Sequence, residues 1–287
     1  NLRYILPHIR SIINQLLNLH NHIKKACKVT LFVLYYNVVK CETMRRIKMN
    51  YVLDTHTHTF ASGHSYSTIR EMAYSAKERG LELLGITEHA PKMPGSCHEF
   101  YFQNLKVVDR MMCGVELLLG AELNILDVNG TVDLPDSILQ KLDITIARLH
   151  VPCMAPGTRL ENTKAYVNAI KNPLINIVGH PDDRRYPVDY KEIVLAAKEH
   201  HTLIELNNAS LGGNGPRVNA RPLDIELLGL CAEYSVPIVV GSDAHIDTAV
   251  GKHDMAEALL KEVNFPEHLI VNQDVDYLKK YVNRYKL

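Results

Sequence analysis

The sequence lacks several features that would assign a chain to a class at once. It has no tryptophan, its 6 cysteines form no Cys-x-x-Cys pair, and its 32 basic residues balance 32 acidic ones. Scattered cysteines exclude a disulfide framework and predict a reducing compartment, the cytoplasm. Zero net charge without a basic stripe argues against a nucleic-acid partner, so any attraction for an anionic substrate must be local.

Other absences narrow the chemistry. There is no G-x-S-x-G elbow for a serine nucleophile and no Walker-type phosphate loop. No apolar run is long enough to cross a bilayer, so no membrane partner is expected. At 287 residues, with 46% hydrophobic and 22% charged residues, the composition is that of an ordinary globular enzyme. The 15 histidines are the one excess.

Residues 1–48 do not share the pattern of the rest of the chain. They contain an amphipathic stretch at 9–19, a basic patch, and an apolar run at 29–39 without the cleavage site of a signal sequence. The chain begins with Asn, and Met49 directly precedes the first regular strand-like run. We expect residues 1–48 to be upstream reading frame outside the fold, and residues 49–287 to be the functional domain. The alternative is a loosely attached helical hairpin or membrane-surface segment.

From Met49 onward, short apolar runs alternate with helical-period segments, which predicts a parallel sheet covered by helices. The runs are Tyr51–Leu53, Leu83–Ile86, Val115–Leu119, Ile144–Leu149, Ile175–Val178, Leu203–Leu206 and Ile238–Val240. The expected helices are Thr68–Arg79, Phe100–Met112, Asn162–Lys171, Asp189–His200, Ala220–Glu233, Met255–Val263 and Val275–Tyr285. Asn129-Gly130 predicts a small β-hairpin. Seven runs favour a closed or nearly closed α/β barrel in a single domain.

Metal-competent side chains follow nearly every apolar run. His56 and His58 end the first run and, being two apart, point to the same face of a strand. Because the carboxyl ends of parallel strands open on one face of a barrel, the later groups should converge there with them. This set comprises His56, His58, His64, His89, Glu122, His150, His180, Asp243 and His245. A single strand-end histidine is usually an ordinary loop residue, but nine coincidences predict a metal site.

Several further residues are candidates for secondary roles. Asp54 could orient an imidazole from behind, or could simply cap the strand end. Arg148 stands two residues before His150, and a buried arginine needs an anionic partner, such as a metal ligand or a bound phosphate. Arg184, Arg185 and Arg217 could also hold phosphate, or lie on the solvated surface. His98, His253 and His268 have no strand-end placement and are not assigned to the site.

Taken together, the motifs resemble the PHP (polymerase and histidinol phosphatase) family of metal-dependent phosphoesterases over about residues 50–287. The matching motifs are Asp54-Thr-His-Thr-His58, Ser62-Gly-His64, Ile86-Thr-Glu-His89, Gly120-Ala-Glu122, Ala147-Arg-Leu-His150, Gly179-His-Pro181, Leu206-Asn-Asn208 and Gly241-Ser-Asp-Ala-His245. The chain looks most like the small stand-alone bacterial PHP phosphatases with a trinuclear zinc site. The resemblance implies a distorted TIM-like (β/α)7 barrel.

The resemblance also implies three adjoining metal sites. The first would use His56, His58, Glu122 and Asp243; the second Glu122, His150 and His180; the third His64, His89 and His245. Nitrogen and oxygen ligands suit three divalent ions, zinc first, with manganese or iron as alternatives. A metal-bridging hydroxide would attack a phosphate monoester in line. Glu122, Asp243 and Arg148 would be the catalytic residues.

Three other hypotheses about the function stay open. Amidohydrolase-type enzymes also place His-x-His on the first barrel strand and cleave C–N bonds, but the additional histidines count against them. A PHP phosphodiesterase or nuclease would use the same site, although the chain shows no basic track for a strand. A metal-stabilised accessory module would be of a different class, and such modules often lose ligands. The expected partner is a small phosphorylated substrate, such as histidinol phosphate, a nucleotide or a sugar phosphate; a homo-oligomer is left open.

Overall fold

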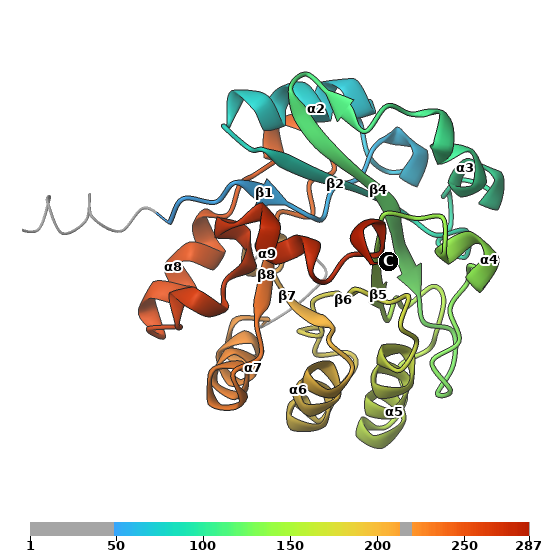
Figure 1. Ribbon diagram of the computed structural model, residues 1–287. Helices are drawn as coiled ribbons and strands as arrows, with labels where there is room; N and C mark the ends of the chain where they lie inside the picture. The colour runs from blue at the N-terminus through green and yellow to red at the C-terminus, as the bar shows by residue number, and fades with distance from the viewer. Residues whose placement is uncertain (1–48, 213–219, 287) are drawn as a thin grey trace, which may run out of the picture. The chain divides into compact units, whose positions relative to one another are not determined.

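A sheet of parallel strands, in the order β1-β2-β4-β5-β6-β7-β8, forms the frame of the domain (Figure 1). The computed structural model describes residues 49–212 and 220–286. The strands are β1 (Leu53–Asp54), β2 (Leu83–His89), β4 (Val115–Asn124), β5 (Ile144–Arg148), β6 (Ile177–Val178), β7 (Leu203–Asn207) and β8 (Ile238–Gly241). All neighbours on this path pair in parallel. The seven predicted runs and their parallel arrangement are confirmed.

The first and last strands close the ring only in part. Thr57 and Ala244 form an isolated parallel bridge, and the His58 amide donates to the Ala244 carbonyl at 2.8 Å. Elsewhere the side chain of Asn272 lies between β1 and β8, at the seam of the barrel, and hydrogen-bonds to both strands. Its Nδ2 donates to the carbonyls of Leu53 (3.2 Å) and Val240 (2.8 Å), and its Oδ1 accepts from the Val240 amide at 2.7 Å. The result is the nearly closed, distorted TIM-like barrel that was predicted.

Helices follow most strands, and local sequence signals set where several of them begin. In α2 (Ile69–Glu78) and α5 (Arg159–Ile170), Thr68 and Thr158 form complete capping boxes with glutamates three residues later. Asp189 caps α6 (Tyr190–Glu199). The others are α3 (Glu99–Asn104), α4 (Asp136–Leu139), α7 (Ala220–Tyr234), α8 (Asp254–Glu262) and α9 (Val275–Lys279). Among the described α-helices, α4 was not predicted.

The predicted helix Phe100–Met112 is wrong in its second half. The chain leaves α3 through a 3-10 turn, Leu105–Val107, and then forms β3 (Met111–Met112), which pairs antiparallel with β4. Arg110 supplies the physical reason. Its guanidinium binds the Asp143 carboxylate at 2.7 Å and two carbonyls of the preceding turn, which holds the chain out of a helix. Cys113 and Gly114, at φ of 56° and 83°, then reverse the chain.

Two other predictions hold with changed extents. The Asn129-Gly130 turn exists, but it joins a single bridge between Ile125 and Val132 rather than a longer ladder. The predicted helix Val275–Tyr285 ends at Lys279 and resumes only as a 3-10 turn, Asn283–Tyr285. The break between them lets Tyr281 and Val282 turn into the core.

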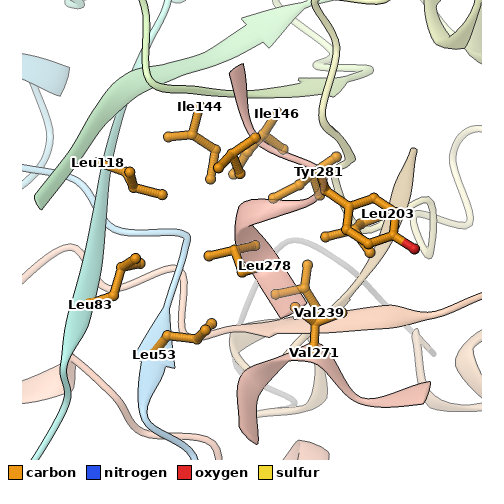
Figure 2. Packing of buried hydrophobic residues seen from close by; sticks show 12 residues of the cluster. Leu53, Leu83, Leu118, Ile144, Ile146, Leu203, Val239, Val271, Leu278 and Tyr281 are labelled. Carbon is orange, nitrogen blue, oxygen red and sulfur yellow. The ribbon is translucent and has the colours of Figure 1, made fainter. Parts of the chain in front are cut away.

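The C-terminal segment fills the interior of the barrel below the site (Figure 2). Leu278, Val271 and Tyr281 pack inside a ring of apolar side chains contributed by the strands. The ring consists of Leu53, Leu83, Leu118, Ile144, Ile146, Ile177, Leu203 and Val239. Close packing of this end fixes the strands whose opposite, carboxyl ends carry the polar residues.

Residues 1–48 and Arg217 lie outside the described residues. The predictions made for them therefore stay predictions. Among the helices that the structure describes, none combines the length and apolar character needed to cross a membrane.

Candidate metal centre

The structure brings all nine predicted side chains together at the carboxyl ends of the strands. His56 and His58 follow β1, His89 ends β2, and Glu122 lies near the end of β4. His150, His180 and Asp243 each stand two residues beyond a strand. Seven of the nine are buried; His64 and His245, on loops, reach the surface. Asp243 adopts the left-handed conformation at φ of 54°, which turns its carboxylate into the barrel mouth.

The innermost group contains His56, His58, Glu122 and Asp243. The two Nε2 atoms lie 3.1 Å apart, and each lies 3.6 Å from a Glu122 oxygen. Asp243 Oδ1 is 3.7 Å from Nε2 of His56 and 3.4 Å from Nε2 of His58. Four ligands about 2.1 Å from a zinc ion lie about 3.4 Å apart along the edges of a tetrahedron. The observed separations match that spacing.

Glu122 joins this group to a second one. Its Oε1 lies 3.5 Å from Nε2 of both His150 and His180, and 3.5 Å from an amino group of Arg148. Neither Glu122 oxygen has a hydrogen-bond partner among the described residues, nor does either ring nitrogen of His150. His89 Nδ1 approaches Oε2 to 2.6 Å, but without hydrogen-bond geometry. Buried polar atoms of this kind are normally satisfied, and a cation would satisfy them here.

The outermost group contains three histidines. Nε2 of His64 lies 3.2 Å from Nε2 of His89 and 3.1 Å from Nε2 of His245. The His64 ring stacks on both of its neighbours. His58 connects this group to the innermost one, because its ring also packs against those of His89 and His245. The donor set throughout is imidazole and carboxylate, which fits zinc, manganese or iron.

Residues behind the histidines fix their orientation. The His56 Nδ1 lies 2.7 Å from Glu205 Oε1, and the His58 Nδ1 lies 3.1 Å from Ser62 Oγ, which in turn donates to Glu88 at 2.6 Å. Such contacts leave Nε2 as the metal-facing nitrogen. A Cβ on Gly241 would come within 2.0 Å of Glu205 Oε1, so a glycine is needed for this contact.

Neither Glu205 nor Glu88 was predicted to have a role in the site, although Glu88 stands within the motif Ile86-Thr-Glu-His89. Both are at most 1% exposed. Glu205 lies in the middle of the predicted apolar run Leu203–Leu206, where the apolar neighbours conceal it. A carboxylate within a strand that is buried on both faces was the available signal, because such a group requires a partner.

The electrostatics of the group favour cation binding. Burial alone would raise the pKa of the Glu122 carboxyl, but its electrostatic interactions with the imidazoles of His150, His89 and His56 hold it well below its ordinary value. Burial, together with neighbouring His89, lowers the pKa of His58 well below normal, which keeps this imidazole neutral. Burial opposes charging of His56 as well, but Glu205 and Asp243 raise its pKa well above normal. A metal ion among the same carboxylates would take the place of that proton.

The residues considered for secondary roles lie in different parts of the fold. Asp54 is fully buried and accepts hydrogen bonds from the amides of Ser242 (3.1 Å) and Gly251 (2.9 Å), so it ties the first strand to the loop that carries Asp243. His253, which was not assigned to the site, lies behind it, with Nε2 3.7 Å from Asp54 Oδ1. Arg184 lines a different cavity, with Arg159 and Tyr190.

A cavity of about 380 Å³ lies over the histidine groups. Arg148 and Arg185 contribute its cationic lining, and Met93, Val151 and Pro152 its apolar lining. Its other lining residues are His64, His89, His150, Asp243 and His245. The volume suits a small molecule.

Fold and site together define the class of protein. It is a parallel α/β barrel whose mouth is lined by imidazole and carboxylate groups. The model of the PHP domain matches residues 54–269. The chain therefore belongs to the PHP family.

Curated bacterial relatives share most of the chain. A probable phosphatase of Caldanaerobacter subterraneus is 48% identical over 238 residues, which cover 83% of this chain and 93% of that protein. A probable phosphatase of Clostridium novyi is 45% identical over 234 residues, covering 82% and 95%.

Solved structures share the fold at lower identity. The histidinol phosphate phosphatase of Lactococcus lactis, in complex with zinc, L-histidinol and phosphate, aligns with a TM-score of 0.54 and 22% identity. The alignment covers 75% of this chain and 95% of that one. A chain of archaeal ribonuclease P with mature tRNA aligns with a TM-score of 0.51 and 15% identity, covering 80% and 89%.

Proposed function

We propose that this protein is a metal-dependent phosphatase that hydrolyses phosphate monoesters of small molecules. The observation that carries the proposal is the position of Glu122. Its two oxygens lie within 3.6 Å of nitrogens from five histidines, His56, His58, His89, His150 and His180, and have no hydrogen-bond partner among the described residues. A carboxylate so placed is suited to bridge two cations. The names of the bacterial relatives support the same activity.

The protein's own residues would divide the work. His56, His58, Glu122 and Asp243 would hold one ion, Glu122 with His150 and His180 a second, and the outer histidines a third. Divalent ions bound there would acidify a water for attack on phosphorus and neutralise charge on the phosphoryl oxygens. Glu205 and Ser62 keep the imidazoles of His56 and His58 oriented. Arg148, 7% exposed and lining the cavity, would hold a phosphoryl oxygen.

Two features favour phosphate monoesters over C–N substrates. The outer histidine group enlarges the site beyond what a two-metal hydrolase of amides needs. Two arginines line the cavity, where a dianionic phosphate would be attracted. The cavity also has the size for a small phosphorylated compound rather than a strand of nucleic acid.

Replacement of Glu122 by glutamine tests the proposal. With zinc or manganese supplied, the wild type should release phosphate from an aryl phosphate, and Glu122→Gln should be slower by at least about 100-fold, because one carboxylate serves two ions. Glu116→Gln is a matched control on the same strand, remote from the mouth, and should retain full turnover. Undiminished turnover of Glu122→Gln would refute the bridging role. Absence of metal-dependent turnover in the wild type would refute the phosphatase.

A further inference from the structure

The arginines of the cavity differ in depth and in what they contact. Arg148 is 7% exposed, and one of its amino groups lies 3.5 Å from Glu122, so it belongs with the metal-facing groups. The side chain of Arg185 is 42% exposed. It shares the cavity lining with Val151 and Pro152. A phosphoryl group held near Glu122 would meet Arg148, and the remainder of the substrate would extend toward Arg185.

Arg185 is held in place from behind. Its Nε lies 2.9 Å and 3.1 Å from the two oxygens of Asp183, and its Nη2 lies 2.6 Å from Oδ2. Asp183 is 5% exposed and does not line the cavity. Burial alone would raise the pKa of Asp183, but its hydrogen bonds and charge pairing with Arg185 lower it, so the carboxylate stays ionised. A two-point contact of this kind fixes the guanidinium plane. The cationic group therefore presents to the cavity in a defined orientation.

Among the described residues, the cavity lining offers a cationic substrate group no carboxylate beyond the one that faces the histidines. Its only carboxylate is Asp243. The oxygens of Asp243 face the histidines and accept from Asn207 Nδ2 at 3.1 Å. An ammonium group in the leaving portion would thus lie beside two guanidinium groups, whose carboxylate partners, Asp183 and Glu122, do not line the cavity. A like-charge contact in a partly desolvated cavity costs binding free energy.

We infer that the substrate is a phosphate monoester whose leaving group carries an acidic function, such as a carboxylate, which Arg185 binds. The inference rests on the proposed phosphatase function and adds the chemistry of the leaving group. It excludes amino-alcohol phosphates as preferred substrates. Arg185 thereby becomes a specificity-determining residue, and Asp183 the residue that positions it.

Three phosphate monoesters of nearly equal size test the inference: phosphoglycolate, 2-hydroxyethyl phosphate and 2-aminoethyl phosphate. All three share a phosphoryl–O–CH2 unit, which carries a carboxylate, a hydroxymethyl or an aminomethyl group. For the metal-reconstituted full chain, kcat/KM for phosphate release should be highest for phosphoglycolate, by about 10-fold over the hydroxyl compound, and lowest for the amine. Dissociation constants, measured by calorimetry, should follow the reverse order, lowest for phosphoglycolate and highest for the amine.

The variants Arg185→Gln and Arg184→Gln form a matched pair. Arg185→Gln should lower the preference for phosphoglycolate over the hydroxyl compound by about 10-fold, which is about 1.4 kcal/mol, because it should impair phosphoglycolate more than the hydroxyl compound. Arg184→Gln removes the same charge from the neighbouring position, which lines another cavity, and should keep the wild-type preference.

The outcomes separate this inference from the proposed function. Equal losses for all three compounds in Arg185→Gln, or a wild-type preference for the amine, would overturn it. So would failure of phosphoglycolate to bind more tightly than the hydroxyl compound. If the compounds bind in the expected order but neither they nor an aryl phosphate is hydrolysed, the preference stands and the phosphatase proposal fails.

Discussion

At the scale of single residues, the candidate metal centre depends on buried carboxylates that orient its histidine rings. Glu205 is 1% exposed and lies 2.7 Å from His56 Nδ1, on the side away from Glu122. For His58 the contact is indirect: Ser62 Oγ lies 3.1 Å from its Nδ1 and donates in turn to Glu88. These contacts select the nitrogen that faces the barrel mouth. Ring orientation is therefore set before any metal binds.

Replacing Glu205 by glutamine tests this pre-orientation. The amide can still contact the imidazole but cannot favour its Nδ1–H form by charge, so metal affinity should fall by about 10- to 100-fold. A competition titration with a zinc chelator of known affinity measures the change. Glu233→Gln, an exposed position on α7, is the control and should leave the affinity unaltered. Equal affinities for Glu205→Gln and wild type would show that the contact does not orient His56.

The sequence was sufficient to predict which nine polar residues meet, because each follows an apolar run and parallel strands end on one face. It could not predict the carboxylates behind them. Glu205 and Glu88 lie inside strands that are buried throughout, and whether such a residue faces the mouth depends on the register of the neighbouring strand. The distinction between Arg184 and Arg185 likewise required the structure, since adjacent residues in a loop have no fixed orientation.

At the scale of elements, the seam between β1 and β8 is the weak point of the barrel. Backbone pairing between these strands is limited to the Thr57–Ala244 bridge among the described residues, and Asn272 supplies the hydrogen bonds of the remainder. Both strands lead directly into metal-facing residues. The seam therefore couples barrel closure to the geometry of the innermost histidine group.

Removal of the Asn272 side chain should be costly. Asn272→Ala leaves the Val240 amide and two carbonyls without partners in a fully buried position, and should lower the free energy of unfolding by about 2–4 kcal/mol. Urea unfolding followed by circular dichroism measures the change. Gln273→Ala, next in the chain but only partly buried, should cost less than about 1 kcal/mol. A similar small loss in both variants would mean that Asn272 does not hold the seam.

Cap residues marked some helix starts well but not all, because α5, despite its complete capping box, begins three residues before its predicted start at Asn162. The helices α2 and α6, with cap residues at their starts, lie within one residue of the predicted bounds. The segment after Asn104 was mispredicted because its apolar residues fit a helical period, while the contact between Arg110 and Asp143, 33 residues away, decides its conformation. Such tertiary contacts override local preference, and spacing alone does not reveal them.

At the scale of the whole domain, the two ends of the barrel have opposite character. The amino end is filled by Leu278, Val271 and Tyr281. The carboxyl end buries Glu122 and Glu205 together with several imidazoles. Concentrating buried carboxylates without a counter-charge is unfavourable, and divalent ions would offset that cost. The apolar end supplies the rigidity with which the polar end can be held.

The most direct test of the central claim is a metal titration of the stripped protein, with bound metal counted by mass spectrometry and phosphate release measured at each point. We expect no turnover without metal, binding of about three zinc or manganese ions per chain, and phosphate release that follows occupancy. Full phosphate release from protein holding no divalent metal would contradict the central claim.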